Sequence, residues 1–217
     1  GKKEIKSGII IVCSTYDGKI GVAVGITDKL SEKANKIYRN HKDLFDFILE
    51  HKSDEVDDLR KIMVTELSSR NWILGSESKT YVRFLTPKIK HLIYINEEKM
   101  GWKRGESFLF EIVVKPSSNK LIFKTVISPS EKRYNRGRFE ELLLEIEGFR
   151  ESKGNKWLVN KDIKQNFIYE ELSWMSDDEI KHSVNSFYDK ITPIVEEVEE
   201  KLIQNEQELL DLKNVGG

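Results

Sequence analysis

The sequence predicts an α+β protein in which a mostly antiparallel sheet is covered by helices, with an N-terminal β-hairpin and a long C-terminal helical segment. Two observations carry this prediction. Stretches that alternate in the manner of strands gather between residues 81 and 170, and stretches with helical spacing of apolar residues lie before and after them. Runs of strands that are separate from runs of helices are typical of this class.

Residues 1–75 are expected to form a hairpin followed by a pair of helices. Asp17-Gly18 separates two β-rich runs between residues 8 and 26, and this dipeptide is a strong hairpin signal. Apolar residues then recur at three-and-four spacing from residue 30 to about His51, and again from Val56 to Leu67. The polar stretch that follows predicts a loop or a domain boundary.

Residues 76–217 are expected to form an α+β accessory domain, either separate from the first part or joined to it in one compact unit. The turn-forming segment 116–119 joins two of its strands. A helix is expected from about Arg136 to Phe149. The expected strands are 81–85, 107–115 and 120–128, with a short strand pair around 156–160 and 166–170.

The C-terminal helix has the clearest start signal. Ser176 and Glu179 have the spacing of a capping box, and apolar residues follow at helical spacing to Leu202. Pro193 either kinks this helix or starts a second one, because proline lacks a backbone donor and clashes one turn back. Beyond Gln204 the pattern thins and the helix is expected to fray.

Composition places the chain among folded proteins. Hydrophobic residues make up 38% and charged residues 34%, which separates it from the disordered class. The longest apolar run, Gly8 to Cys13, is far shorter than the roughly 20 residues of a membrane span, so we expect no membrane partner. The single cysteine, Cys13, is expected to be a small buried side chain, and no signal-peptide pattern is present. These features predict a cytoplasmic protein.

The near-zero net charge conceals two regions of opposite sign. From Arg83 to Arg138 there are thirteen Lys or Arg against five Asp or Glu, a net charge of +8, whereas Glu170 to Gly217 carries a net charge of −9. Such a basic segment suits a surface that faces a polyanion. It equally suits a face that packs on the chain's own acidic helix.

A set of basic and aromatic residues in the basic segment is the candidate nucleic-acid site. Cations release counterions from phosphates, and exposed aromatic rings stack on unpaired bases. The alternative is structural, with Trp102 in the core and the charges on a solvated surface. The candidate residues are Arg83, Lys88, Trp102, Lys103, Arg104, Lys132, Arg133, Arg136 and Arg138.

Motifs for catalysis are not evident in the sequence. The four histidines lie far apart, without the spacing of a metal site, and no nucleophile elbow, P-loop or dinucleotide fingerprint occurs. Several Glu-x-Lys triplets are expected in so Glu- and Lys-rich a chain, and Glu4-Ile5-Lys6 precedes Asp17 in the reverse of the order that a metal-dependent nuclease needs. We therefore expect no catalytic residues, no metal and no cofactor.

Residues 31–202 resemble the region that follows the catalytic domain in one group of PD-(D/E)XK nuclease superfamily proteins. The segments that carry the resemblance are NKIYRNHKDLFDFILEH, YVRFLTPKI, GWKRGESFLFEIVV and KLIFKTVISP. The matching residues are Tyr38, His41, Lys42, Phe45, Phe47, Arg83, Phe84, Trp102, Phe110 and Glu111. Residues 8–34 also resemble the start of the DHHA1 module of alanyl-tRNA synthetases, but the glycine-rich continuation of that module is absent.

The first resemblance implies a nuclease-associated accessory domain for target binding or assembly, with catalytic residues upstream of residue 1. Together with the basic segment it predicts a non-catalytic module that binds or targets DNA or RNA. One alternative is a protein-interaction module, or a homo-oligomer, that uses the acidic C-terminal helix and its apolar stripe. Another is an intact metal-dependent nuclease.

Overall fold

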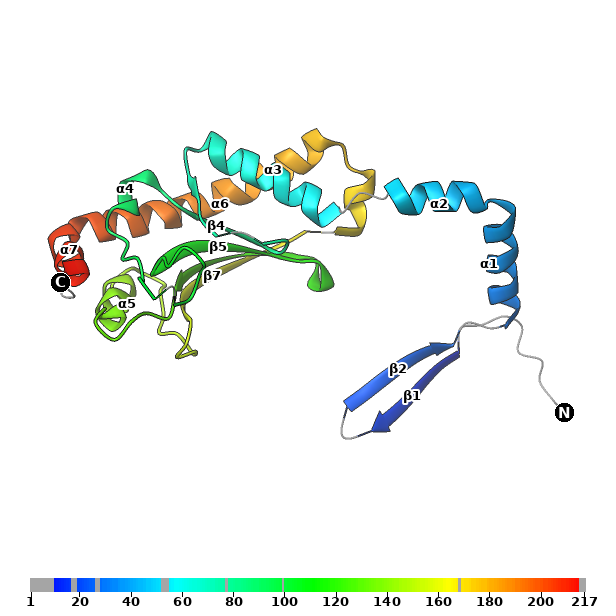
Figure 1. Cartoon of the computed structure of the whole chain (residues 1–217), viewed down its shortest axis with the longest axis horizontal. Helices are drawn as coiled ribbons and strands as arrows, with labels where there is room; N and C mark the ends of the chain where they lie inside the picture. The colour runs from blue at the N-terminus through cyan, green and yellow to red at the C-terminus, as the bar shows by residue number, and fades with distance from the viewer. Residues whose placement is uncertain are drawn as a thin grey trace. The chain divides into compact units, whose positions relative to one another are not determined.

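The protein has an α+β fold. We describe a computed structural model over residues 10–16, 19–25, 28–51, 55–76, 78–98, 100–167 and 169–214. The chain divides into two compact units, Gly1–Lys52 and Ser53–Gly217, which are considered separately. Figure 1 shows the arrangement of the elements and labels most of them.

The first unit contains the predicted hairpin and two helices. Strands β1 (Ile10–Tyr16) and β2 (Lys19–Gly25) pair antiparallel, with Tyr16 opposite Lys19. Asp17 and Gly18 lie outside the described residues, as does the side chain of Cys13. Helices α1 (Asp28–Asn40) and α2 (Lys42–His51) follow.

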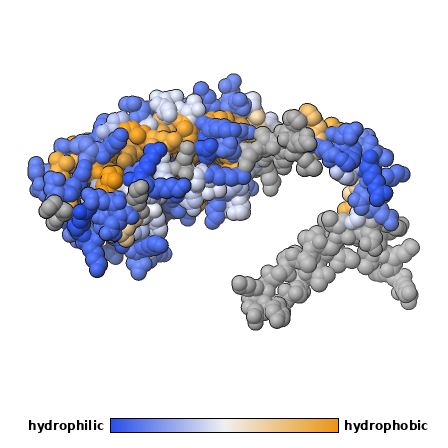
Figure 2. Space-filling view, in the orientation of Figure 1, coloured by the Kyte–Doolittle hydropathy of each residue, from blue (hydrophilic) through white to orange (hydrophobic). Residues whose placement is uncertain are grey.

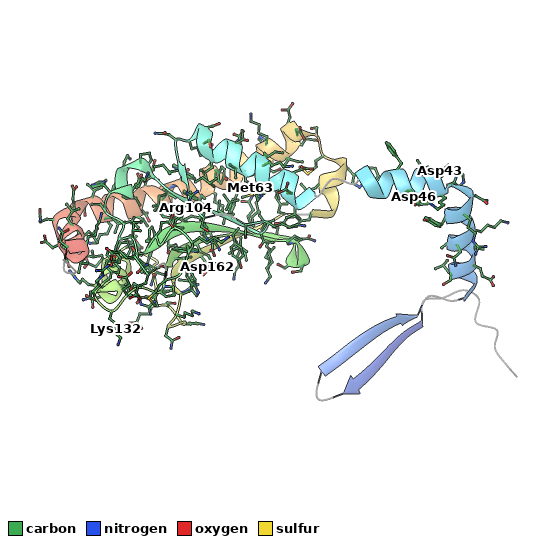
Figure 3. All side chains as sticks on the ribbon, viewed as in Figure 1. Asp43, Asp46, Met63, Arg104, Lys132 and Asp162 are labelled. Carbon is green, nitrogen blue, oxygen red and sulfur yellow. The ribbon has the colours of Figure 1, made fainter. Side chains whose placement is uncertain are left out.

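The expected single helix from residue 30 to His51 is therefore wrong, because it is divided at His41. Contacts across the junction hold the two pieces together. The Tyr38 hydroxyl donates to Asp46 Oδ1 at 3.0 Å, and Lys42 pairs with the same carboxylate. The Tyr38 and Phe45 rings lie 5.9 Å apart. Figure 3 labels Asp46 on α2.

The second unit is built on a five-stranded antiparallel sheet in which neighbouring strands follow chain order. Its central strands are long and pair along their whole length, so the register between them is fixed at every residue. The strands are β3 (Ile73–Leu74), β4 (Tyr81–Leu85), β5 (Phe108–Lys115), β6 (Lys120–Ile127) and β7 (Leu158–Asn166).

Five α-helices of the described chain belong to this unit. Ser176 and Glu179 form the predicted capping box at the start of α6, which runs through Pro193 without ending. The helices are α3 (Glu55–Ser69), α4 (Pro87–Lys90), α5 (Arg136–Leu144), α6 (Asp177–Gln204) and α7 (Glu206–Asn214). Two short 3-10 helices, Pro116–Ser118 and Tyr169–Trp174, complete it.

The core lies between one face of the sheet, the inner face, and the helices. Helices α3 and α6 lie side by side along this face (Figure 1). Phe84 stacks with Phe110 at 5.2 Å, and Phe108 lies 5.3 Å from Phe139 of α5. Met63 is fully buried on α3, where Figure 3 labels it. The apolar stripe of α6 is buried in the same core.

Three further expectations differ from the structure. The predicted strand pair at 156–160 and 166–170 is wrong, because residues 158–166 pair continuously with β6 as one strand, apart from a bulge. The helix expected to reach Phe149 ends at Leu144. The segment beyond Gln204 forms α7 instead of fraying, since Leu209 is buried in the core.

The compact units divide after Lys52, whereas the expected boundary lay after residue 75. Helix α3 accounts for the difference. It packs on α6, where the Tyr188 hydroxyl donates to Met63 O at 2.7 Å and Lys181 pairs with Glu66 at 3.3 Å. Helix α3 thus belongs with the sheet.

Candidate nucleic-acid interface

A row of alternating charges crosses the second unit's sheet. Arg83 Nε donates to Glu111 Oε2 at 2.7 Å, and Lys124 Nζ lies 3.8 Å from Glu111 Oε1. The register sets these residues directly opposite each other, so cross-strand attraction between unlike charges stabilises the pairing. The row, with one residue from each of β4 to β7, is Arg83, Glu111, Lys124 and Asp162.

Residues two positions apart on a strand share one face of a sheet, so this row belongs to a wider surface, opposite the helices. A second row, Tyr81, Val113, Ile122 and Lys164, lies beside it, and Lys115 lies opposite Lys120 beyond that. We call this surface the outer face. It comprises Tyr81, Arg83, Glu111, Val113, Lys115, Lys120, Ile122, Lys124, Asp162 and Lys164.

The outer face carries five cations against two acids, a net charge of +3. Both acids are already paired within the protein: Glu111 with Arg83 and Lys124, and Asp162 with Arg150 and with Lys164 at 3.5 Å. Positive charge on the lysines therefore exceeds what the two carboxylates neutralise. A surface of this kind attracts anions.

Two cations lie directly opposite each other at one end of the outer face. Lys115 is exposed, Lys120 is half-buried, and no ion pair of either is found among the described residues. Like charges at directly opposite positions destabilise a strand pair. A bound anion would relieve that repulsion.

The outer face also has an apolar component. Tyr81 and Ile122 are half-buried, Val113 is buried at the same face, and all three lie outside the core cluster. The Arg83 guanidinium lies 4.4 Å from the centre of the Tyr81 ring, a cation–π arrangement that orders both side chains. Charged and flat apolar groups therefore lie next to each other on one surface.

Two residues of the sequence-predicted set are brought together here, but one of them is not accessible. Trp102 is only 5% exposed and packs on Trp157, with 4.9 Å between ring centres. Arg83 lies 5.7 Å from the Trp102 ring. Trp102 therefore packs in the core, which was the structural alternative to a nucleic-acid contact in the sequence analysis.

The other predicted residues lie in several places. Arg104 and Lys132 are clearly apart in Figure 3. Lys103, Arg104 and Lys132 are exposed, and Arg104 Nη1 donates to Leu74 O at 2.9 Å. Arg136 Nη1 donates to Lys156 O at 2.8 Å. The predicted set is thus not one patch.

Two predicted cations, Lys88 and Arg138, are paired with acids of the C-terminal helices. Lys88 pairs with Glu199 at 2.9 Å, which raises the pKa of Lys88. Arg138 pairs with Glu208 of α7, and the pKa of that carboxyl is lowered by the hydrogen bond. The basic and acidic regions of the sequence thus neutralise each other in part within the fold. Hydrophilic residues predominate on the visible surface of the second unit, with a band of apolar residues between them (Figure 2).

Arg133, which is exposed, belongs to a hydrogen-bond network centred on the buried Glu131. The Glu131 carboxylate accepts from the backbone N–H of Glu98 at 2.8 Å, the Tyr94 hydroxyl at 2.8 Å and Arg133 Nε at 2.7 Å. These bonds, with the Glu98 N–H foremost, lower the pKa of Glu131 below its usual 4.5. Burial raises the pKa of Tyr94, and its bond to Glu131 raises it further.

This network predicts a pH-dependent contribution to stability. Because the pKa of Glu131 is lower in the folded state, its contribution is fully present above about pH 4.5 and is lost as the pH falls through the folded-state value. We expect the difference in Tm between the wild-type protein and Glu131→Gln to be largest near pH 7 and to shrink below about pH 4.5. Thermal unfolding followed by circular dichroism measures it. A difference that stays constant down to about pH 3 would contradict the assignment.

The lysines of the outer face were missed by sequence reasoning. Lys115, Lys120 and Lys124 lie in the basic segment, and the alternation of the strands puts them on one face. The strand alternation in the sequence therefore could have identified these three lysines. Lys164 could not be added, because its strand was predicted with the wrong boundaries.

Comparisons of the chain with protein-family models, with curated proteins and with solved structures found no match. Among the described residues, no three His, Cys, Asp or Glu side chains lie together in a group that could hold a metal ion. In the same part of the chain, no helix is both long enough and apolar enough to cross a membrane.

Proposed function

We propose that this chain is a non-catalytic nucleic-acid-binding module, of the kind associated with PD-(D/E)XK nucleases, and that the outer face of its sheet contacts a single strand. The carrying observation is the group of four lysines, Lys115, Lys120, Lys124 and Lys164, on one face beside Tyr81. Lysines attract phosphates, and an aromatic ring supports an unpaired base.

The mixture of apolar and cationic side chains on the outer face favours a single strand over a duplex. In a duplex the base faces are stacked inside, so the apolar row of Tyr81, Val113 and Ile122 would have nothing to contact. In a single strand the bases can lie on this row while phosphates reach the lysines around it.

The acidic C-terminal helix is a weaker candidate for a partner surface. The apolar stripe that made it attractive in the sequence is buried in the protein's own core, including Phe187, Ile191 and Val198. Several of its acids are paired as well, among them Glu199 with Lys88.

The test is binding of a fluorescent single-stranded oligonucleotide, measured by anisotropy over a series of salt concentrations. If four lysines contact phosphates, log K should fall with log salt with a slope of about −3. Absence of binding at roughly 50 mM salt, or binding that does not depend on salt, would overturn the proposal.

A further inference from the structure

A pocket of about 410 Å³ lies at the edge of the sheet near β3. Its apolar wall includes Leu85, Ile93 and the exposed Ile95. Its size falls within the range of small-molecule sites, which are mostly apolar with a few placed polar groups. Gly75, also in the lining, donates its N–H to Arg83 O at 2.8 Å, so the pocket begins next to the outer face.

One buried polar atom of a residue that lines this pocket has no hydrogen-bond partner among the described residues. Glu106 is 7% exposed, and its Oε2 atom is buried without a hydrogen-bond partner among the described residues. Burying a carboxyl oxygen without a donor is costly, so native proteins rarely leave one unpaired. A ligand that brings an N–H donor would remove that cost.

The backbone fixes Glu106 in this position. Gly105 has a φ of 79°, and a Cβ at that residue would lie 2.5 Å from Asn96 O. The turn is closed by the Asn96 N–H donating to Gly105 O at 2.7 Å. Any residue with a side chain at Gly105 would force the turn apart, so the turn that precedes Glu106 requires glycine.

Three cations surround the pocket: Lys90, Arg104 and Lys213. They come from α4, from the segment before β5 and from α7, so the pocket joins parts of the chain that are distant in sequence. With one carboxyl inside, the lining has an excess of positive charge. A ligand should therefore combine an N–H donor, a flat apolar body and an anionic group.

We infer that this pocket takes one nucleotide of the bound strand, with the base donating to Glu106 and the phosphate near Lys90, Arg104 and Lys213. The choice of a nucleotide rests on the proposed function. Guanine fits best, because its Watson–Crick edge presents two neighbouring donors, N1–H and N2–H. Uracil presents one donor between two acceptors, which a carboxylate repels.

The test is titration of the protein with GMP and with UMP, followed by NMR. GMP should bind about ten-fold more tightly than UMP, the discrimination of one good base contact. Glu106→Gln should lose most of this preference, because the amide replaces one acceptor by a donor. Lys90→Ala should lower the affinity for GMP and for UMP by a similar factor. The control Glu151→Gln, at an exposed position, should change neither the affinity for GMP nor that for UMP.

Equal binding of GMP and UMP by the wild-type protein, or an unchanged preference in folded Glu106→Gln, would overturn the inference. If the protein binds oligonucleotides but not GMP, the pocket assignment fails and the proposed function stands. If it prefers GMP but binds no oligonucleotide, the pocket stands and the outer-face proposal fails. If it binds neither, both fail.

Discussion

Reversing the charge of Lys115, Lys120 and Lys164 together is expected to lower the affinity for a single-stranded oligonucleotide by at least about 100-fold at roughly 0.1 M salt. Three attractive contacts are lost, and three repulsive ones replace them. The salt slope should also fall in magnitude by about 2, since each lost contact removes roughly 0.7 for a single strand. Anisotropy titrations at several salt concentrations measure both quantities.

The positions in this variant are chosen to limit new repulsion within the fold. Lys124 is left unchanged because it lies 3.8 Å from Glu111, where a new carboxylate would meet a buried one. Lys164 lies 3.5 Å from Asp162, but its side chain is 59% exposed and Asp162 also pairs with Arg150, so a carboxylate at position 164 can turn towards solvent. Lys115 and Lys120 remain a like-charged pair after reversal, so the cross-strand repulsion is no worse than before.

A matched control separates a specific surface from net charge alone. Reversing Lys132, Lys153 and Lys156, which are all exposed, changes the total charge by the same amount. These lysines do not belong to the outer face, so most of the affinity should remain. Equal loss in the two triple variants would show that binding follows total charge and would contradict the outer-face assignment.

The largest expected effect on stability comes from Phe110→Ala, which should lower the free energy of unfolding by about 3–5 kcal/mol. Phe110 is fully buried on the inner face, with ring centres of Phe84, Phe108 and Phe123 at 5.2, 5.1 and 5.9 Å. Removing the ring leaves a cavity between sheet and helices. Native domains have only about 5–15 kcal/mol of stability, so the loss is severe.

Urea denaturation of the wild-type protein and of Phe110→Ala measures this difference in the free energy of unfolding. Ile122→Ala is the control, because Ile122 lies on the outer face of the adjacent strand and outside the core cluster. It should cost about 1 kcal/mol, which is the span of strand propensities. If Phe110→Ala and Ile122→Ala lowered the free energy of unfolding by similar amounts, the assignment of the core to the inner face of the sheet would be wrong.

Local sequence signals predicted much of this fold. The capping box of Ser176 and Glu179 marks the start of α6, and alternation marks the three central strands. The turn at residues 116–119 joins β5 to β6 as expected, because Asn119 takes a left-handed conformation with a φ of 49°. Each of these signals acts within a few residues.

The site was harder to predict, because its geometry depends on contacts between distant residues. Trp102 is buried because Trp157 packs on it, and nothing near Trp102 in the sequence indicates this. No acid near Lys88 in the sequence indicates its ion pair, which forms with Glu199 of α6. The charge row exists only once the register of β4 and β7 against the central strands is known.

The most direct test of the outer-face assignment is the mapping of amide chemical shifts on adding a single-stranded oligonucleotide. The largest changes should fall on β4 to β7 at outer-face positions, including Tyr81, Val113, Ile122 and Lys164, with smaller ones on α6. Changes confined to α6, or to the segment around Lys132, at saturating oligonucleotide would contradict the account.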